Sequence, residues 1–280
     1  MNIAEAINKA KKILISNNIK SPELDTELLM SKVLNKSREE IILDSNKEIE
    51  EKILIEFNSL VIQRSKGKPI AYLIRKKNFW KNSFVVNENV LVPRPDTELI
   101  IEEVLRLLKN KKKLNVLDIG TGSGCIILSI LDEKKEFTGI GIDISQKCIN
   151  ISRTNAYNIG IKNRVKFFKS DVDNFNYGKY DLILSNPPYI KQAKLRCLEK
   201  DVIGFEPKIA LDGGLDGLSV IRKVVKKSSE LIKNNGKLVL EIGFDQKEKV
   251  KLILKKEGYY INKILKDYAG HDRCIISTKK

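Results

Sequence analysis

Six residues, Ser185-Asn186-Pro187-Pro188-Tyr189-Ile190, place carbonyl acceptors and an aromatic ring at the end of an apolar segment. The apolar segment, Tyr180 to Leu184, has the composition of a buried parallel strand. Because proline cannot continue a strand's hydrogen bonding and restricts its predecessor to extended backbone, Asn186 and Pro187 should lie extended at the strand's carboxyl end. Their side-chain and main-chain carbonyls could accept both hydrogens of one planar NH2 group, and Tyr189 offers a flat face for stacking. A strand end closed by two prolines, without a chemical role, is the alternative.

A glycine-rich turn, Asp118-Ile119-Gly120-Thr121-Gly122-Ser123-Gly124, follows another apolar segment. Glycines at alternate positions let the backbone turn tightly and approach a ligand closely. The turn is not a dinucleotide-binding GxGxxG motif, because Cys125 and Ile127 stand where that motif needs glycine, and it contains no GxxxxGK[ST] phosphate loop. Its interpretation therefore depends on the segments that follow.

Two aspartates end the next two predicted strands. Asp143 follows Gly141-Ile142 and could accept hydrogen bonds from both hydroxyls of a ribose. Asp171 could accept from an adenine amino group, with Val172 packing against the ring; helix capping is the alternative for each aspartate. Since the carboxyl ends of successive parallel strands share one edge of a sheet, the following residues together predict a site for an adenosine-containing cofactor: Gly120, Thr121, Gly122, Ser123, Gly124, Asp143, Asp171, Val172 and Asn186.

From Leu114 onward, predicted strands and helices alternate as in a doubly wound parallel sheet. Strands are expected at 115–119, 137–142, 164–169, 180–185, 237–242, 259–265 and 273–278, with helices at 124–131, 146–158, 218–233 and 246–256. The connection 266–272 is too short for a helical crossover, so the last two strands should pair antiparallel as an edge hairpin. This α/β pattern resembles the Rossmann-like, seven-stranded fold of class I S-adenosylmethionine-dependent methyltransferases, with its antiparallel last strand.

Residues 1–69 carry apolar residues at helical spacing, and Ser21-Pro22 is a typical helix start, so this part should form a compact N-terminal helical bundle. It contains no catalytic grouping and is either a partner-docking surface or a structural cap. Residues 70–95 alternate in strand fashion around Asn82-Ser83, which predicts a β-hairpin linker whose Phe79-Trp80 packs on a neighbouring domain. The third domain, 96–280, should begin with a helix capped by Asp96 or Thr97, and nearby Arg94 could reach a ligand or an acidic partner.

Composition narrows the class of protein. The chain has 280 residues, of which 42% are hydrophobic and 31% charged, a soluble globular balance. No apolar segment approaches the roughly 18 residues of a membrane span, and the first residues lack the apolar block of a signal peptide, so we expect a cytoplasmic protein. A single histidine, His271, and four cysteines without a CxxC pair disfavour a zinc site or a histidine-based triad.

The net charge of +16 is unevenly distributed. Residues 1–70 carry 12 Lys+Arg and 11 Asp+Glu, and the remaining residues carry 40 and 25. Dispersed lysine on a solvated surface explains this excess at least as well as a nucleic-acid interface, because no RNP-like aromatic motif or arginine-rich segment accompanies it. Charge alone does not decide between the two.

Over nearly its full length the chain resembles the bacterial peptide chain release factor glutamine N5-methyltransferases, the HemK-type enzymes. The resemblance is carried by Ser21-Pro22 with Asp25, Lys68-Pro69-Ile70-Ala71-Tyr72, Phe79-Trp80, Pro93-Arg94-Pro95-Asp96-Thr97-Glu98, Gly120–Gly124, Asn186-Pro187-Pro188-Tyr189-Ile190, Phe205-Glu206-Pro207, Ala210-Leu211 and Gly213-Gly214-Leu215-Asp216-Gly217-Leu218. The tetrapeptide Asn186–Tyr189 alone is shared with adenine-methylating enzymes. Ile74-Arg75 departs from the family where glycine is expected, and Val172 is smaller than some residues found there.

The resemblance implies a monomeric cytoplasmic enzyme that uses S-adenosylmethionine, without a metal, to methylate the glutamine of the Gly-Gly-Gln loop of release factors. The helical domain would dock the release factor, and Asn186, Pro187 and Tyr189 would be catalytic, with Pro188 completing the substrate site. Direct nucleic-acid binding is not expected. Three alternatives remain: a glutamine methyltransferase of a ribosomal protein, an exocyclic-amine (adenine N6) nucleic-acid methyltransferase, and a non-catalytic cofactor-binding or scaffold protein.

Overall fold

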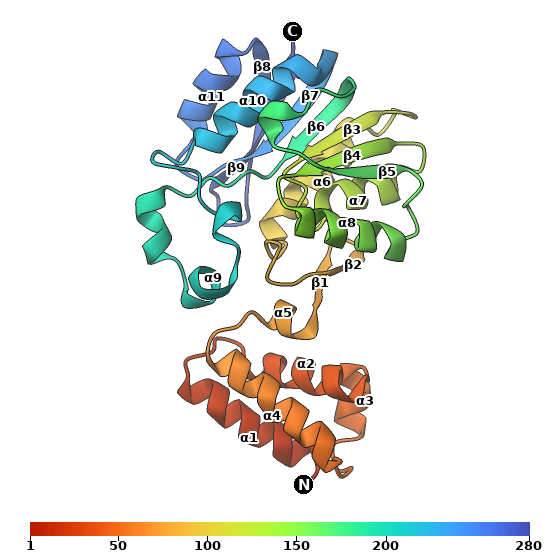
Figure 1. Cartoon of the computed structure of the whole chain (residues 1–280), viewed down its shortest axis with the longest axis vertical. Coiled ribbons are helices and arrows are strands. Elements are labelled where there is room, and N and C mark those ends of the chain that lie inside the picture. Colours follow the sequence, from red (N-terminus) through yellow and green to blue (C-terminus); the bar gives the residue numbers. More distant parts are fainter. The chain divides into compact units, whose positions relative to one another are not determined.

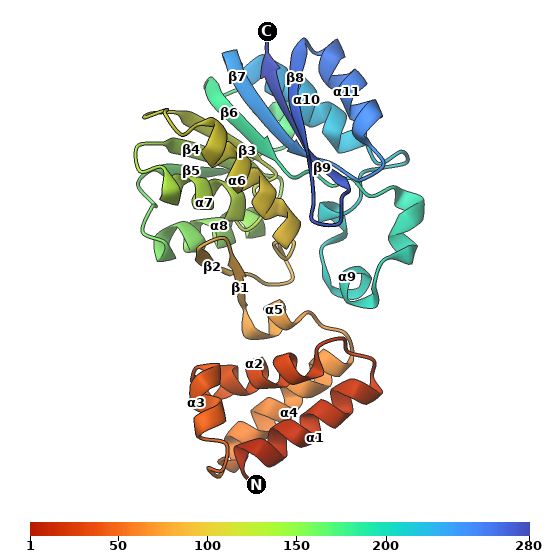
Figure 2. The same cartoon turned by 180° about the vertical axis from the view of Figure 1, so that it is seen from behind.

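The computed structural model describes residues 1–280, apart from the side chain of Lys200, and the chain divides into two compact units. The first, here the helical unit, comprises Met1–Lys76 together with Glu199–Phe205. The second, here the sheet unit, comprises Lys77–Leu198 and Glu206–Lys280. Figures 1 and 2 show the elements of each unit from two opposite sides.

The helical unit is a small bundle with one apolar core. Its helices are α1 (Ile3–Ser16), α2 (Pro22–Leu34), α3 (Arg38–Leu43), α4 (Glu51–Ser65), α5 (Ile70–Ile74) and α9 (Lys200–Phe205). Leu14, Leu29, Met30 and Phe57 are fully buried in the core. Capping boxes at the starts of α1 and α3 pair backbone N–H groups that a helix end leaves free.

A buried ion pair joins α2 to α4 inside this bundle. The Arg64 guanidinium Nε donates to Asp25 Oδ2 over 2.7 Å, and both side chains are almost fully buried. The Ser21 hydroxyl donates to the other Asp25 oxygen over 3.1 Å. Ser21 is the residue that precedes α2, as predicted, but its hydroxyl bonds Asp25 and not the helix backbone.

The predicted hairpin begins later than the sequence pattern indicated. Residues Ile70–Ile74 form helix α5 and not a strand. The chain reverses at Trp80-Lys81, between β1 (Lys76–Phe79) and β2 (Asn82–Val85), so the turn predicted at Asn82-Ser83 lies two residues too late. These five residues are all apolar, and a short continuous apolar run does not distinguish a strand from a helix turn. Arg75, which ends α5, has a left-handed φ of 55°, the conformation that glycine adopts most easily. Although glycine is absent at this position, the turn still forms, because Arg75 takes the strained left-handed conformation that it requires.

From Lys77 on the hairpin belongs to the sheet unit, and polar contacts tie it to the rest of that unit. The indole Nε1 of Trp80 donates to Glu133 over 2.8 Å, and its backbone N–H donates to Glu98 over 2.9 Å. The backbone N–H of Val85 donates to the Asn155 side chain over 2.7 Å. Phe79 is fully buried and Trp80 partly buried, and both belong to the sheet unit themselves.

The sheet unit contains a seven-stranded sheet in the order β5-β4-β3-β6-β7-β9-β8. The strands are β3 (Asn115–Ile119), β4 (Thr138–Asp143), β5 (Val165–Lys169), β6 (Tyr180–Ser185), β7 (Ile232–Glu241), β8 (Tyr259–Lys266) and β9 (Asp272–Lys279). All pairs from β5 to β7 are parallel, and β9 is antiparallel to both its neighbours. The predicted fold and its antiparallel last strand are confirmed.

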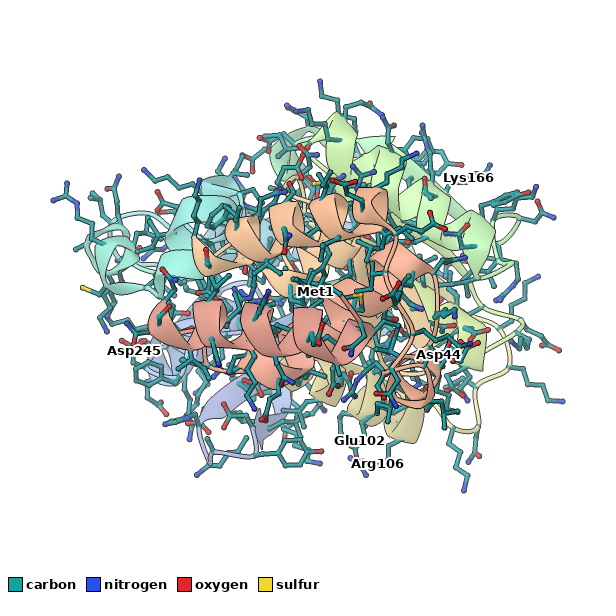
Figure 3. The ribbon with its side chains drawn as sticks, turned by 90° about the horizontal axis from the view of Figure 1, so that it is seen from below. Met1, Asp44, Glu102, Arg106, Lys166 and Asp245 are labelled. Atoms are coloured by element: carbon teal, nitrogen blue, oxygen red, sulfur yellow. The ribbon has the colours of Figure 1, made fainter. Side chains whose placement is uncertain are left out.

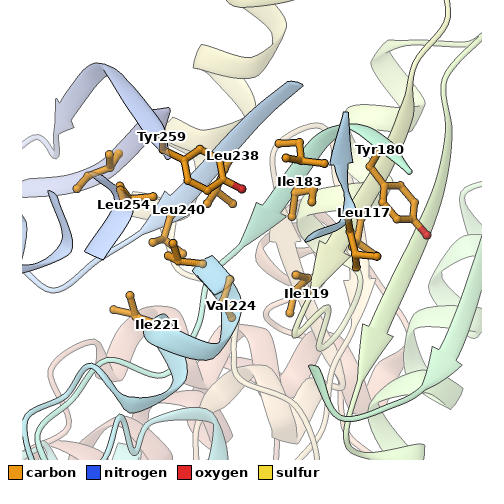
Figure 4. Close-up of a cluster of buried hydrophobic side chains, with 14 of the residues drawn as sticks. Leu117, Ile119, Tyr180, Ile183, Ile221, Val224, Leu238, Leu240, Leu254 and Tyr259 are labelled. Carbon is orange, nitrogen blue, oxygen red and sulfur yellow. The ribbon is translucent and has the colours of Figure 1, made fainter. Parts of the chain in front are cut away.

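The sheet is covered by α6 (Glu98–Leu107), α7 (Cys125–Glu133), α8 (Gln146–Asn158), α10 (Ser219–Leu231) and α11 (Lys247–Lys256), with the short helices η1 (Pro95–Thr97), η2 (Val172–Asn174), η3 (Gln192–Cys197) and η4 (Lys208–Ala210) in the connections. Figure 4 shows the core beneath α10 and α11, where Ile221 and Val224 meet sheet residues such as Leu238 and Leu240. Ile140 of β4 also belongs to this core, whereas a side chain on Gly139 would lie 2.7 Å from Ile127 of α7. Because neighbouring residues of a strand face opposite ways, α7 packs on the other face.

Strand β7 begins at Ile232 and not at Lys237. The turn-like sequence Lys233-Asn234-Asn235-Gly236 predicts a break, but the strand continues with a register shift opposite β6, and Asn235 takes a φ of 62°. Lys166 of β5, the strand at one edge of the sheet, is exposed and projects outward (Figure 3). Among the described residues, no helix has the length and apolar character needed to cross a bilayer.

Candidate active site

A cavity of about 320 Å³ lies at the carboxyl ends of β3, β4, β5 and β6. Most of the residues predicted for the site line this one cavity: Gly120, Thr121, Gly122, Ser123, Asp143, Asp171, Val172, Asn186, Pro187 and Pro188. Gly124 and Tyr189 are not part of its lining. The parallel sheet thus brings together side chains that are up to about seventy positions apart in the chain.

The glycine turn after β3 forms an open cradle. Its first residues, Gly120 and Thr121, each donate a backbone hydrogen bond to the Ile142 carbonyl over 2.9 Å, which ties the turn to β4. Gly120, Gly122 and Gly124 have φ values of 75°, 56° and 81°. A side chain on Gly120 or Gly122 would meet no protein atom within 4 Å, whereas one on Gly124 would lie 2.9 Å from Leu128. The first two glycines therefore keep space open for a ligand, and the third allows the helix to pack.

Asp143 and Asp171 lie at the ends of the neighbouring strands. Asp143 accepts from the backbone N–H groups of Gly122 and Ser145 over 3.0 and 2.9 Å, and its burial raises the pKa of this carboxyl above its usual range. Asp171 accepts from the Asp173 backbone N–H over 3.0 Å and caps η2. Asp171 therefore has the capping role weighed as its alternative, while it also lines the cavity.

A further carboxyl lies behind the glycine turn. The Thr121 hydroxyl donates to one oxygen of Asp118 over 2.7 Å, and the other Asp118 oxygen is buried without a partner among the described residues. Burial raises the pKa of Asp118 to about 7. Asp118 does not line the cavity, but the open glycine cradle and the strand-end carboxylates Asp143 and Asp171 do, and they suit a ligand that carries hydroxyl and amino donors. The residues present therefore fit S-adenosylmethionine, which has a ribose, an adenine and an α-amino group.

The Asn186 side chain belongs to a chain of hydrogen bonds that ends at a buried glutamate. Its Nδ2 donates to the Thr97 hydroxyl oxygen over 3.2 Å, and Thr97 in turn donates to Glu241 Oε2 over 2.7 Å. The Tyr189 hydroxyl donates to Glu241 Oε1 over 3.2 Å. Glu241 is 2% exposed, and burial raises its pKa to about 7. We call Asn186, Thr97, Glu241 and Tyr189 the Glu241 network.

Sequence reasoning gave Thr97 another role and overlooked Glu241. Thr97 precedes α6, but its hydroxyl makes no capping bond because it bonds Glu241 instead. Glu241 is the last residue of β7, so the criterion that selected Asp143, a carboxylate at the end of a predicted strand, would also have selected Glu241. Tyr189 reaches the site through its hydroxyl, since its ring does not line the cavity.

Arg94 lines the cavity and forms an ion pair with Glu206. Its guanidinium lies 2.6 Å from Glu206 Oε1, and the Glu206 side chain is almost fully buried. Pro207, next in the chain, also lines the cavity. The acidic group that Arg94 meets in this structure thus belongs to the same chain. No cluster of three or more His, Cys, Asp or Glu side chains is arranged to hold a metal ion in the part of the chain that the structure describes.

The fold has counterparts among solved structures. The crystal structure of a ribosomal protein L11 methylase from Lactobacillus delbrueckii subsp. bulgaricus superposes with a TM-score of 0.52. The match covers 70% of this chain and 84% of that chain at 18% sequence identity, so it supports the fold alone.

The sheet order, the glycine turn and the strand-end carboxylates define a class I S-adenosylmethionine-dependent methyltransferase. Two family models match the chain: "PrmC N-terminal domain" over residues 5–74 and "Methyltransferase small domain" over residues 97–261. A release factor glutamine methyltransferase of Caulobacter vibrioides is 33% identical over 100% of this chain and 97% of its own length. One from Buchnera aphidicola subsp. Acyrthosiphon pisum is 37% identical over 100% and 99%. The chain belongs to the release factor glutamine methyltransferase family.

Proposed function

We propose that this protein transfers a methyl group from S-adenosylmethionine to the side-chain amide nitrogen, N5, of the glutamine in the Gly-Gly-Gln loop of peptide chain release factors, and so supports translation termination. The observation that carries the proposal is the state of the Asn186 amide. Its NH2 group donates to Thr97, while no donor among the described residues pairs with its Oδ1 at the cavity. A free carbonyl oxygen beside a cofactor-sized cavity suits a substrate that presents N–H groups.

The cofactor would be held by the residues around the glycine cradle. Gly120, Thr121, Gly122 and Ser123 would form the close backbone approach, Gly124 lets helix α7 pack beside them, and Asp143 would accept from the ribose hydroxyls. Asp171 and Val172 would bind the adenine, and Asp118 supports the glycine turn through its hydrogen bond from Thr121. S-adenosylmethionine, when bound, supplies a methyl group on an electrophilic sulfonium.

The chain's own residues address the weak nucleophilicity of an amide nitrogen, whose lone pair is delocalised into its carbonyl. Asn186 Oδ1 and the Pro187 carbonyl would accept the two substrate N–H groups and fix the amide plane, so that one face of the nitrogen meets the cavity. Positioning of this kind can lower a barrier by up to roughly 7–11 kcal/mol. Pro187 and Pro188 hold the backbone rigid, and Tyr189 acts through Glu241. Water takes the proton that the nitrogen loses.

The proposed protein partner is the release factor, bound in part by the helical domain, 1–69, with 70–95 as linker and 96–280 as methyltransferase domain. We propose further that the enzyme works in the cytoplasm as a monomer, without a metal and without direct nucleic-acid binding. Under this proposal the excess positive charge is a property of a solvated surface.

One experiment separates the candidate substrates. The purified protein is incubated with labelled S-adenosylmethionine and a release factor, the same factor with its loop Gln changed to Ala, a ribosomal protein preparation, or duplex DNA. We expect label on the wild-type release factor alone. Label on DNA would show that Asn186 and Pro187 accept from an adenine amino group, because the same two acceptors suit both NH2 groups. Failure of calorimetry to detect S-adenosylmethionine binding would favour a non-catalytic scaffold.

A further inference from the structure

The Asn186 side-chain amide carries a carbonyl oxygen and an NH2 group, and the proposed reaction needs the carbonyl oxygen to face the cavity. Its oxygen accepts hydrogen bonds, whereas its NH2 group only donates them. If the NH2 group faced the cavity, it would meet the N–H groups of a substrate amide as donor against donor. Asn186 is partly exposed and lies in a loop after β6, so packing alone does not choose the end.

The direction of the hydrogen bonds in the Glu241 network makes that choice. A Thr97 hydroxyl has one proton, and that proton is given to Glu241 over 2.7 Å. The Thr97 oxygen can then only accept from Asn186, so the NH2 group of Asn186 must point to Thr97. We propose that Glu241 is a positioning residue that fixes the Asn186 amide with its carbonyl oxygen toward the substrate. This inference rests on the proposed function.

The second oxygen of Glu241 shows why this residue must be a carboxylate. Tyr189 donates to Oε1 while Thr97 donates to Oε2, so both oxygens accept. A glutamine offers one carbonyl oxygen to these two hydroxyl donors. A protonated glutamate likewise turns one of its oxygens into a donor. In either case the proton of Thr97 is free to turn toward Asn186 Oδ1, and the amide is no longer held in one direction.

Several charged or titratable groups face Glu241 from the surrounding elements. Arg273 of β9 favours the carboxylate, whereas Asp96 of η1 disfavours it. Tyr189 donates to it, and the thiols of Cys125 on α7 and Cys274 on β9 are close enough to interact with it electrostatically. Burial of Glu241 outweighs the help from Arg273 and raises its pKa to about 7. Methylation should therefore increase as pH rises through about 7, where the carboxylate forms.

The test uses four variants of the full chain: Glu241→Gln, Thr97→Val, their double variant, and Thr97→Ser as the matched control that keeps the hydroxyl. For each we would measure kcat and KM for a release factor between about pH 6 and about pH 8.5. Calorimetry would give the Kd of S-adenosylhomocysteine and, in its presence, the Kd of a peptide carrying the Gly-Gly-Gln loop.

We expect Glu241→Gln to lower kcat/KM by about 10- to 100-fold at about pH 8, to remove the rise with pH, and to weaken peptide binding, with S-adenosylhomocysteine binding nearly unchanged. Thr97→Val should act similarly and Thr97→Ser should approach the wild type. Because Glu241 acts on Asn186 only through Thr97, the double variant should be no worse than Thr97→Val.

Additive losses in the double variant would overturn the inference, as would an unchanged pH profile and kcat/KM in Glu241→Gln. If Glu241→Gln does not fold, the Thr97 variants decide. Equal kcat/KM of Thr97→Val and the wild type overturns the inference, whereas a loss of kcat/KM in Thr97→Val that is absent in Thr97→Ser supports it. A wild-type protein that binds S-adenosylhomocysteine but methylates no release factor would overturn the proposed function, and this inference with it. These outcomes differ, so the two failures can be told apart.

Discussion

The carboxylate of Asp143 accepts a hydrogen bond from the backbone N–H of Gly122 over 3.0 Å, so the end of β4 and the glycine turn of β3 are joined directly. The same carboxylate is proposed to accept from the ribose of the cofactor. Replacing Asp143 with Ala should therefore remove one ligand contact and loosen the cradle. We expect the Kd of S-adenosylmethionine, measured by calorimetry, to rise by at least about 10-fold.

A matched control for this change is Asp181→Ala. Asp181 lies near the beginning of β6, at the end of the sheet opposite the cavity. There it accepts a hydrogen bond from the Asn115 backbone N–H and pairs with Lys233. Its loss should leave the Kd unchanged. Equal affinities of the Asp143→Ala protein and the wild type would contradict the assigned cofactor contact.

Alanine at Gly120 and at Gly124 should have different effects, although both residues have similar positive φ values. Each change strains the backbone by about 1 kcal/mol. A methyl group on Gly120 enters open space in the cavity, so cofactor affinity should fall while the melting temperature changes little. A methyl group on Gly124 meets Leu128 and Ser152, so the melting temperature should fall much further. Thermal unfolding and calorimetry on both variants measure these two quantities. Equal losses of melting temperature and equal losses of cofactor affinity in the two variants would contradict the assigned roles of the two glycines.

Asn186→Ala should abolish methylation of the release factor and leave binding of S-adenosylmethionine largely intact. The variant loses the acceptor proposed to hold the substrate amide but keeps the glycine cradle and Asp143. Transfer of labelled methyl groups measures the first effect and calorimetry the second. Asn163→Ala, at an exposed position before β5, is the control and should behave as the wild type. Turnover by Asn186→Ala at the wild-type rate would contradict the proposed role of Asn186 as the substrate's hydrogen-bond acceptor.

Asp25→Ala should destabilise the helical unit by about 3–5 kcal/mol, because it leaves the buried Arg64 guanidinium without its counter-charge. The sheet unit holds the whole cofactor site, so S-adenosylmethionine should bind with unchanged affinity. Denaturant unfolding followed by circular dichroism checks the first expectation and calorimetry the second. Surface pairs such as Lys135 with Asp132 offer a control, because an exposed pair contributes only about 0–1 kcal/mol.

Glu241 should make stability depend on pH in a defined direction. Its folded-state pKa is raised from 4.5 to about 7. The stabilising contribution of the protonated form is complete below about pH 4.5 and is lost as pH rises through about 7. Relative to Glu241→Gln, the wild type should therefore lose up to roughly 3 kcal/mol of unfolding free energy between about pH 4.5 and about pH 7.5. Urea denaturation of both proteins across this range measures the loss. If the unfolding free energies of the two proteins change with pH in the same way, the pKa of Glu241 is not raised in the folded protein.

The sheet and the edge of its ligand site were predictable because they depend on local patterns. Apolar segments ending in Gly120, Asp143, Asp171 and Asn186 each predict a strand end, and the rules for parallel sheets bring those ends together. The same patterns failed where few residues carry the signal. The five residues of α5 are all apolar and so fit a short buried strand or a helix turn equally, and the start of β7 contains Asn235-Gly236, which indicates a turn.

The Glu241 network could not be predicted from local patterns. The bond between Thr97 and Glu241 joins residues 144 positions apart, and Thr97 also occupies a position where capping is the ordinary role of threonine. Which hydrogen bond a hydroxyl makes is decided by the tertiary contacts around it. A search for carboxylates at every predicted strand end, and not only at those next to the glycine turn, would have brought Glu241 to attention.

The segment Glu199–Phe205 belongs to the helical unit although it lies between Asn186 and the last helices of the sheet unit in sequence. Within that unit Lys20 pairs with Glu199, and Gly67 lies next to Phe205. The chain therefore passes between the two units three times and not once. Anyone who grafts the N-terminal module of a relative onto this enzyme must transplant Glu199–Phe205 as well, and a single protease cut between the units would not release either one.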